Sequence, residues 1–321
     1  MNKNKIKVIF FGNNSIILDC LIKNSDVQSV FCQPMEKNNS SLMEIKKITD
    51  KYSISFHQPE KKELYNHINY IKELNPDLIV VCGYKYIVPS EIFNIPKLKT
   101  INIHPSYLPH YRGQHVVNWA IVNGETETGV TIHFIDEGID TGDIIIQKKI
   151  PILFEDSASV LHERIYLEAY DLLKLVLDRI SSGSTLQSRK QDNSKASYFK
   201  PRSPQDGAVD WNKNGIEIYN LIRALVKPWP GAYSYLKDRK VIFWNAQFEN
   251  DSYSSSPGMI TNILGSKLII NVEGGKLLVD DYVALDKNGN EINLELQIGD
   301  KFEKESDGNY TYSSCHGSSS R

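Results

Sequence analysis

The chain has 321 residues, a length that suggests two domains, and its 40% hydrophobic and 24% charged residues are typical of an ordinary soluble protein. Its formal charge of −2 gives no bulk attraction to nucleic acid or an anionic membrane, and no apolar run is long enough to span a bilayer. The four cysteines, Cys20, Cys32, Cys82 and Cys315, form no CxxC pair, which favours free thiols in a reducing cytoplasm.

The first part of the chain alternates short apolar runs with amphipathic segments. Residues 6–11 and 27–32 are expected to form strands, and residues 16–23 and 42–52 helices. Residues 75–83 (NPDLIVVCG) follow as a central strand. This alternation predicts a parallel, doubly wound α/β sheet, in which ligands bind beyond the carboxyl ends of the strands.

The turn after the first strand, GNNS, lacks the GxGxxG pattern of dinucleotide-binding proteins. Simple turn chemistry and a phosphate cradle at a helix N-terminus explain it equally well. Lys85, just past a buried strand, is either a solvated lysine or, as we slightly prefer, a phosphate contact. The candidate substrate-binding residues are therefore Gly12, Asn13, Ser15 and Lys85.

Residues 100–113 (TINIHPSYLPHYRG) hold the strongest functional signal. Asn102 and His104 alternate with isoleucines, so a strand would place both polar side chains on one side. Prolines and Gly113 then form a loop. Residues 129–135 predict another strand, followed by an acidic loop, residues 136–143, that contains Asp140. An amide, an imidazole and a carboxylate in these positions predict an active site.

The remaining histidines do not suggest a metal. His104, His110, His115 and His133 follow no ligand spacing, so no metal site is expected. His133 lies within a strand pattern, which favours a structural role.

The second part of the chain predicts a separate domain. A helix over residues 158–180 leads into a polar, linker-like stretch, residues 181–197. A helix over residues 215–225 and short β-like runs from residue 241 onward suggest a small β-barrel. Trp211 and Trp229 are expected to pack the joint between domains. The boundaries predicted are residues 1–200, residues 201–305 and a loose tail, residues 306–321.

Several motifs together resemble the formyltransferases that use 10-formyltetrahydrofolate. They are Asn102-x-His104, the loop SYLPHYRG (residues 106–113) and Asp140 in GIDTG. Tyr107 is bulkier than the family's usual residue there. GAVDW (207–211), KPWPGAYSYL (227–236) and NWAIVNGETETGVTIH (118–133) are similar to enzymes that formylate nucleotide-linked amino sugars. The resemblance covers about residues 6–246.

The resemblance implies a Rossmann-like catalytic domain, a homodimer and a role in surface polysaccharide biosynthesis (lipopolysaccharide or O-antigen). Asn102 would donate an amide N–H to the oxyanion that forms when an amine attacks the formyl carbon. His104 would act as general base or steady the oxyanion if charged, and Asp140 would orient it. Folate contacts are expected from Tyr86, Ile87, Val88, Ser106, Leu108, Arg112, Gly113 and Asp140.

The acceptor of the formyl group is expected to be a nucleotide-linked amino sugar, not tRNA. The family's tRNA enzymes carry a basic insertion after the second strand, but here Gln33-Pro34 is followed by MEKNNSSLMEIKK, without Gly or Arg. Residues 205–321 hold 12 Lys and Arg against 16 Asp and Glu, and phosphate-backbone binding needs cations. A dTDP-4-amino-4,6-dideoxyhexose is the favoured acceptor. The alternatives are a methionyl-tRNA formyltransferase and a non-catalytic nucleotide- or folate-binding protein.

Overall fold

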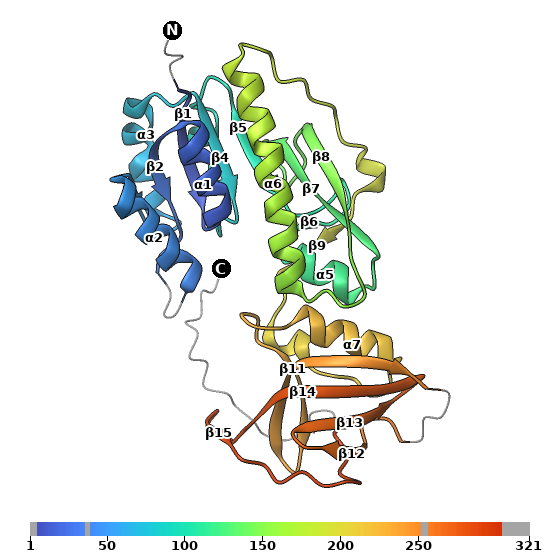
Figure 1. Ribbon diagram of the computed structural model, residues 1–321. Helices are drawn as coiled ribbons and strands as arrows, with labels where there is room; N and C mark the ends of the chain where they lie inside the picture. The colour runs from blue at the N-terminus through green and yellow to red at the C-terminus, as the bar shows by residue number, and fades with distance from the viewer. Residues whose placement is uncertain (1–4, 36–38, 252–255, 304–321) are drawn as a thin grey trace. The chain divides into compact units, whose positions relative to one another are not determined.

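A computed structural model describes residues 5–35, 39–251 and 256–303. The chain divides into two compact units (Figure 1). Unit 1 comprises Met1–Val117, Thr126–Ile152 and Leu161–Pro201, and unit 2 comprises Asn118–Glu125, Leu153–Val160 and Arg202–Arg321. The expected tail, residues 306–321, and Cys315 lie outside the described residues. Among the described cysteines, Cys20, Cys32 and Cys82 are buried free thiols, as predicted.

Unit 1 is built on a seven-stranded sheet with the strand order β3-β2-β1-β4-β5-β7-β8. The strands from β3 to β5 pair in parallel, as the alternating pattern predicts. The last two run antiparallel, which that pattern did not predict. The strands are β1 Lys7–Gly12, β2 Asp26–Phe31, β3 Ser55–His57, β4 Leu78–Cys82, β5 Thr100–His104, β7 Glu127–Phe134 and β8 Ile144–Pro151.

Helices cover both faces of this sheet, which makes it doubly wound. On one face, apolar side chains of β1, β2 and β4 pack against those of η1, α3 and α4. On the other, Figure 1 shows α1 and α6 on the same side of the sheet, and Cys20 of α1 donates to the Tyr170 carbonyl of α6. The helices before residue 200 are α1 Ser15–Asn24, α2 Ser40–Tyr52, η1 Glu63–His67, α3 Ile68–Leu74, α4 Ser90–Phe93, α5 Val116–Val122, α6 Ala158–Ser181 and η2 Asn193–Lys195.

The stretch expected to be a linker folds back onto unit 1. Arg189 bridges to Ile144 at the start of β8. Beyond η2, β9 (Tyr198–Phe199) pairs in parallel with β6 (Arg112–Gly113), which belongs to the loop after β5. Polar composition predicted a connection between domains, whereas backbone pairing makes this stretch part of unit 1.

Unit 2 contains an antiparallel sheet with the path β10-β11-β14-β13-β12, and β15 pairs with β14. Residues 301–303 bridge its two edge strands, since Glu303 pairs with Tyr235 and Lys301 with Met259. The sheet therefore closes into a small barrel, as predicted. Its elements are η3 Pro204–Gly207, α7 Gly215–Ala224, β10 Ala232–Leu236, β11 Arg239–Asn250, β12 Ile260–Leu264, β13 Lys267–Val272, β14 Gly275–Leu285 and β15 Glu291–Ile292.

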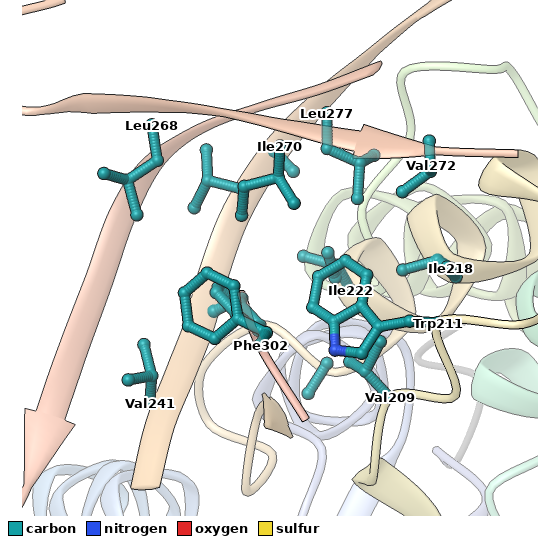
Figure 2. Packing of buried hydrophobic residues seen from close by; sticks show 14 of the residues in the cluster. Val209, Trp211, Ile218, Ile222, Val241, Leu268, Ile270, Val272, Leu277 and Phe302 are labelled. Atoms are coloured by element: carbon teal, nitrogen blue, oxygen red, sulfur yellow. The ribbon is translucent and has the colours of Figure 1, made fainter. Parts of the chain in front are cut away.

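Trp211 lies in the hydrophobic core of unit 2, so its expected place at a joint between domains is wrong. Figure 2 shows its indole among aliphatic side chains and Phe302. The ring stacks on Phe302 at 5.6 Å between centroids, and its N–H donates to the Ser234 hydroxyl at 2.9 Å. An indole that is 6% exposed needs such a partner for its polar N–H.

Hydrogen bonds explain why two short segments of the first part of the chain join unit 2. Asn118 donates to the Ala224 carbonyl at the end of α7. The Arg223 guanidinium donates to the carbonyls of Leu153 and Asp156. Within the described residues, no helix is both long and apolar enough to cross a membrane.

Candidate active site

Asn102 and His104 lie on β5, between β4 and β7 in the sheet. Strand alternation places both side chains on one face, and both approach the same carboxylate oxygen, Asp140 Oδ1. The Asn102 amide nitrogen lies 3.2 Å from this oxygen and His104 Nδ1 lies 3.5 Å from it. The three residues that the sequence singled out are thus brought together in space.

Asp140 reaches the two strand residues from the loop between β7 and β8. β7 ends at Phe134, which pairs with Ile101 near the start of β5, so the loop must fold back to meet Asn102 and His104. Asp140 adopts a left-handed conformation with φ of 54°, which is unusual for a residue other than glycine. Its second carboxylate oxygen accepts a hydrogen bond from the Gly113 amide at 2.9 Å.

The hydrogen bond of His104 defines its basic nitrogen. Nε2 lies 2.7 Å from the Tyr111 carbonyl oxygen. Because a carbonyl only accepts, Nε2 must carry a proton, and in the neutral ring the lone pair is then on Nδ1. Nδ1 is the nitrogen that faces Asp140. A proton taken up by His104 would therefore lie between the ring and the carboxylate.

His133 is a member of this cluster that sequence reasoning treated as structural. Its Nδ1 lies 2.8 Å from the Phe134 carbonyl oxygen and so donates to it. That leaves Nε2 as an acceptor, 3.2 Å from the Asn102 amide nitrogen. Asn102 therefore directs one N–H to His133 and the other to Asp140. The pairing of Asn102 with His133 across β5 and β7 was not visible before the register was known.

The electrostatics favour an ionised carboxylate beside a neutral imidazole. Burial raises the pKa of the Asp140 carboxyl, but neighbouring groups, first among them the His104 ring and also the Gly113 amide, outweigh it and hold that pKa well below its ordinary value. Burial lowers the pKa of His104, and this effect exceeds the opposite one of the Asp140 charge. The neutral His104 ring therefore has a lone pair, on Nδ1, that is available to accept a proton.

The other residues expected to contact a cofactor lie in two segments. In the segment after β4, the Tyr86 hydroxyl donates to Glu60 at 3.2 Å, Ile87 is 72% exposed and Val88 is buried. In the loop after β5, Ser106 and Leu108 are buried, and Ser106 donates to the His110 carbonyl. Whether these side chains contact a cofactor stays a prediction.

Arg112 and Gly113 have structural roles in that loop. The Arg112 side chain is only 1% exposed, and its guanidinium donates to Gln191, Asn193 and Tyr198. These bonds point to a supporting role in place of a direct ligand contact. A side chain on Gly113 would meet the Phe199 carbonyl oxygen at 2.2 Å, and its φ of 103° favours glycine.

The residues expected to bind the acceptor surround the end of β1. A side chain on Gly12 would lie 1.9 Å from the Cys82 carbonyl oxygen, so close packing of β1 on β4 accounts for this glycine. Asn14 caps α1 by accepting from the Ile17 amide, which favours turn and capping chemistry for the GNNS sequence. Ser15 is the first residue of α1. Binding of a phosphate by Asn13, Ser15 or Lys85 stays a prediction.

Comparison with known families identifies both halves of the chain. A family model described as formyl transferase matches residues 5–177, and one described as formyl transferase, C-terminal domain, matches residues 202–292.

Among the residues that the structure describes, no three His, Cys, Asp or Glu side chains gather as a metal site.

Individual relatives carry different names. The chain is 36% identical over 282 residues to methionyl-tRNA formyltransferase of Clostridium acetobutylicum, covering 85% of this chain and 90% of that protein. It is 38% identical over 263 residues to the bifunctional polymyxin resistance protein ArnA of Wigglesworthia glossinidia brevipalpis, covering 80% of this chain and 40% of that protein. A solved N-formyltransferase from Helicobacter canadensis superposes with a TM-score of 0.65 at 26% identity, covering 85% of this chain and 98% of that one.

Proposed function

Because this chain belongs to the formyl transferase family, we propose that it transfers a formyl group from 10-formyltetrahydrofolate to the amino group of a nucleotide-linked amino sugar. The family uses this folate as its formyl donor. The observation that carries the proposal is the meeting of Asn102, His104 and Asp140 at one carboxylate oxygen. A non-catalytic binding protein would not require an amide, a base and a carboxylate in this arrangement.

The surroundings of the site suit a folate. Ile87 is 72% exposed and Ile139, next to Asp140, is 54% exposed. Exposed large aliphatic side chains in segments that flank a polar cluster are suited to cover a flat ring system. Residues 86–88 and the loop 106–113 would hold the folate, as expected from the resemblance. When bound, it would supply the formyl carbon that an amine attacks. The bond between that carbon and the folate nitrogen would then break, and tetrahydrofolate would leave with the proton that the amine gave up.

His104 would act as the general base. Its Nδ1 carries the lone pair, as the Tyr111 carbonyl requires, and can take the proton that the attacking amine loses. The Asp140 carboxylate, 3.5 Å away, would then stabilise the imidazolium. The hydrogen bond from the Gly113 amide keeps this carboxylate in place.

Asn102 would stabilise negative charge that develops on the formyl oxygen. Such a donor contributes roughly 3–4 kcal/mol to catalysis in other acyl-transfer enzymes. Both amide hydrogens of Asn102 are used within the protein, by Asp140 and by His133. Donation to the substrate therefore requires Asn102 to exchange one of these two bonds.

Charge supports an amino sugar as the acceptor. Residues 205–321 carry 12 Lys and Arg against 16 Asp and Glu. On the barrel of unit 2, Asp280, Asp281 and Glu291 line one concave surface. A polyanion such as tRNA gains affinity from cations along its path, whereas a nucleotide-linked sugar needs few of them for its pyrophosphate. The Helicobacter canadensis enzyme was solved with folinic acid and dTDP-3-aminofucose, which supports the same class.

Methionyl-tRNA is the second candidate acceptor. The observation that favours it is the 36% identity to the Clostridium acetobutylicum enzyme over most of both chains. A methionyl-tRNA formyltransferase of Malacoplasma penetrans is 35% identical to this chain, and the match covers 92% of this chain and 96% of that protein. The two candidates make opposite predictions for one assay.

A formyl-transfer assay with 10-formyltetrahydrofolate separates them. The acceptors are a panel of dTDP-, UDP- and GDP-linked 3-amino and 4-amino sugars, with methionyl-tRNA beside them. We expect the fastest transfer to a dTDP-4-amino-4,6-dideoxyhexose. Faster formylation of methionyl-tRNA than of every sugar would overturn the acceptor class, while activity confined to UDP- or GDP-sugars would change only the nucleotide.

We also propose that the enzyme is cytoplasmic, forms a homodimer and acts in surface polysaccharide biosynthesis. These features rest on the family resemblance. Light scattering of the purified protein tests the dimer, since a monomer mass at assay concentration contradicts it.

A further inference from the structure

Gln191, in the stretch that composition marked as a linker, bridges two parts of the active site. Its side-chain Nε2 donates to the backbone carbonyls of Asp140, at 2.8 Å, and Gly142, at 2.7 Å. Its Oε1 accepts from two nitrogens of Arg112, Nε at 3.2 Å and Nη2 at 2.6 Å. Both ends of the amide are therefore engaged, which fixes its orientation.

Arg112 holds the oxygen end of the Gln191 amide. Its remaining bonds run from Nη2 to the Asn193 side-chain oxygen at 2.8 Å and from Nη1 to the Tyr198 hydroxyl at 2.5 Å. The guanidinium also lies over the Tyr198 ring, 5.3 Å from its centroid. Four hydrogen bonds to three side chains therefore hold the buried guanidinium, and with it the Gln191 amide, in one orientation.

The Asp140 loop needs such support. Asp140 adopts a left-handed backbone conformation, which is unfavourable for residues that have a side chain. A side chain at Gly142 would meet the Phe134 carbonyl oxygen at 1.8 Å, so the loop returns very close to β7. Gln191 contacts both of these residues through their carbonyl oxygens. A loop in a strained conformation stays there only when its surroundings determine it.

We propose that Gln191, held by Arg112, is a positioning residue that sets the place of the Asp140 carboxylate against His104. It touches no reacting atom and acts through the loop backbone. Gln191, Asn193 and Tyr198 thereby support the active site of unit 1 through Arg112 and the Asp140 loop. The kinetic consequence rests on the proposed formyl transfer, whereas the effect on the loop does not.

Two substitutions at one position separate the donor half of the amide from the acceptor half. Gln191→Glu keeps the size of the side chain and an oxygen for Arg112, but it places a second oxygen against the carbonyls of Asp140 and Gly142. Gln191→Ala removes both halves. Lys190→Ala is the matched control, because Lys190 is the exposed neighbour in the same segment.

The first readout is hydrogen exchange at the Gly113 amide, which donates to Asp140 Oδ2 at 2.9 Å. We expect exchange to be about tenfold faster, or more, in Gln191→Glu than in wild type and Lys190→Ala, because displacement of the loop breaks this bond. The second readout is formyl transfer. A displacement of about 1 Å can cost roughly 100-fold in rate, so kcat should fall by 10- to 100-fold, with a smaller change in the KM for the folate.

Because Gln191→Ala could also disturb folding, Gln191→Glu decides the outcome. A folded Gln191→Glu protein with wild-type exchange at Gly113 overturns the proposal, whatever its activity. Wild-type kcat in that variant overturns it as well. If the wild-type protein transfers no formyl group to any acceptor, the proposed function fails, and the exchange measurement still tests the role of Gln191.

Discussion

Replacement of Asp140 by Asn tests the charge pairing at the centre of the site. Asparagine keeps the shape of the side chain and an oxygen that can accept from the Gly113 amide. It removes the negative charge that lies 3.5 Å from His104 Nδ1. The variant therefore changes charge while it leaves most of the local packing intact.

The size of the effect follows from the distance. For charges 3.5 Å apart, the Asp140–imidazolium attraction amounts to roughly 5 kcal/mol at an effective dielectric constant of about 20. If His104 takes the proton from the amine as proposed, the wild-type protein gains this stabilisation and Asp140→Asn does not. Since about 1.4 kcal/mol corresponds to a factor of ten, kcat should fall by roughly three to four orders of magnitude.

The direction in which the pH profile moves is an independent test of the same charge pairing. Burial lowers the pKa of His104, and the Asp140 charge raises it. Loss of that charge leaves burial less opposed, so the pKa falls further below its ordinary value. His104 must be neutral to accept a proton, and the acidic limb of the kcat/KM profile should move to lower pH in Asp140→Asn.

The assay is formyl transfer to the best acceptor of the panel, followed across pH. Glu137→Gln is the matched control, because it removes the same charge from an exposed position of the same loop and should leave both kcat and the acidic limb unchanged. A kcat for Asp140→Asn within about tenfold of wild type, or an acidic limb that moves to higher pH, would refute the pairing of Asp140 with His104.

Three further outcomes are expected. His104→Ala should lower kcat by roughly 100- to 10,000-fold with the circular dichroism spectrum unchanged; near wild-type turnover would remove it as the base. Gly113→Ala should lower the melting temperature, because the added carbon would lie 2.2 Å from the Phe199 carbonyl oxygen at a φ of 103°; an unchanged melting temperature would contradict this packing. Trp211→Ala should destabilise unit 2 by about 3–5 kcal/mol in denaturant titrations, through loss of a buried indole; a loss below about 1 kcal/mol would show that the core does not depend on it.

The sequence predicted the parts of the site that depend on local pattern. Strand alternation placed Asn102 and His104 on one side, and the motif resemblance singled out Asp140. His133 was missed because its contact with Asn102 depends on β7 running antiparallel to β5. A short apolar run does not reveal the direction of its strand.

Gln191 was missed for a different physical reason. Its stretch is polar and lacks periodicity, which is typical of a linker, and its order comes from pairing with residues about eighty positions earlier. Such long-range backbone pairing leaves little trace in local composition. Trp211 illustrates the same limit, since its position in a closed barrel core depends on contacts with Phe302, far along the chain.

In the proposed formyl transfer, the geometry of the cluster would couple proton uptake by His104 to the availability of Asn102. Asp140 Oδ1 is shared by the Asn102 amide at 3.2 Å and by His104 Nδ1 at 3.5 Å. While His104 is neutral, only the amide donates to this oxygen. Once Nδ1 is protonated, the imidazolium is the stronger donor, because charged hydrogen bonds exceed neutral ones. The bond between Asn102 and Asp140 would then weaken, and in the proposed mechanism the freed N–H would turn to the formyl oxygen as negative charge develops there.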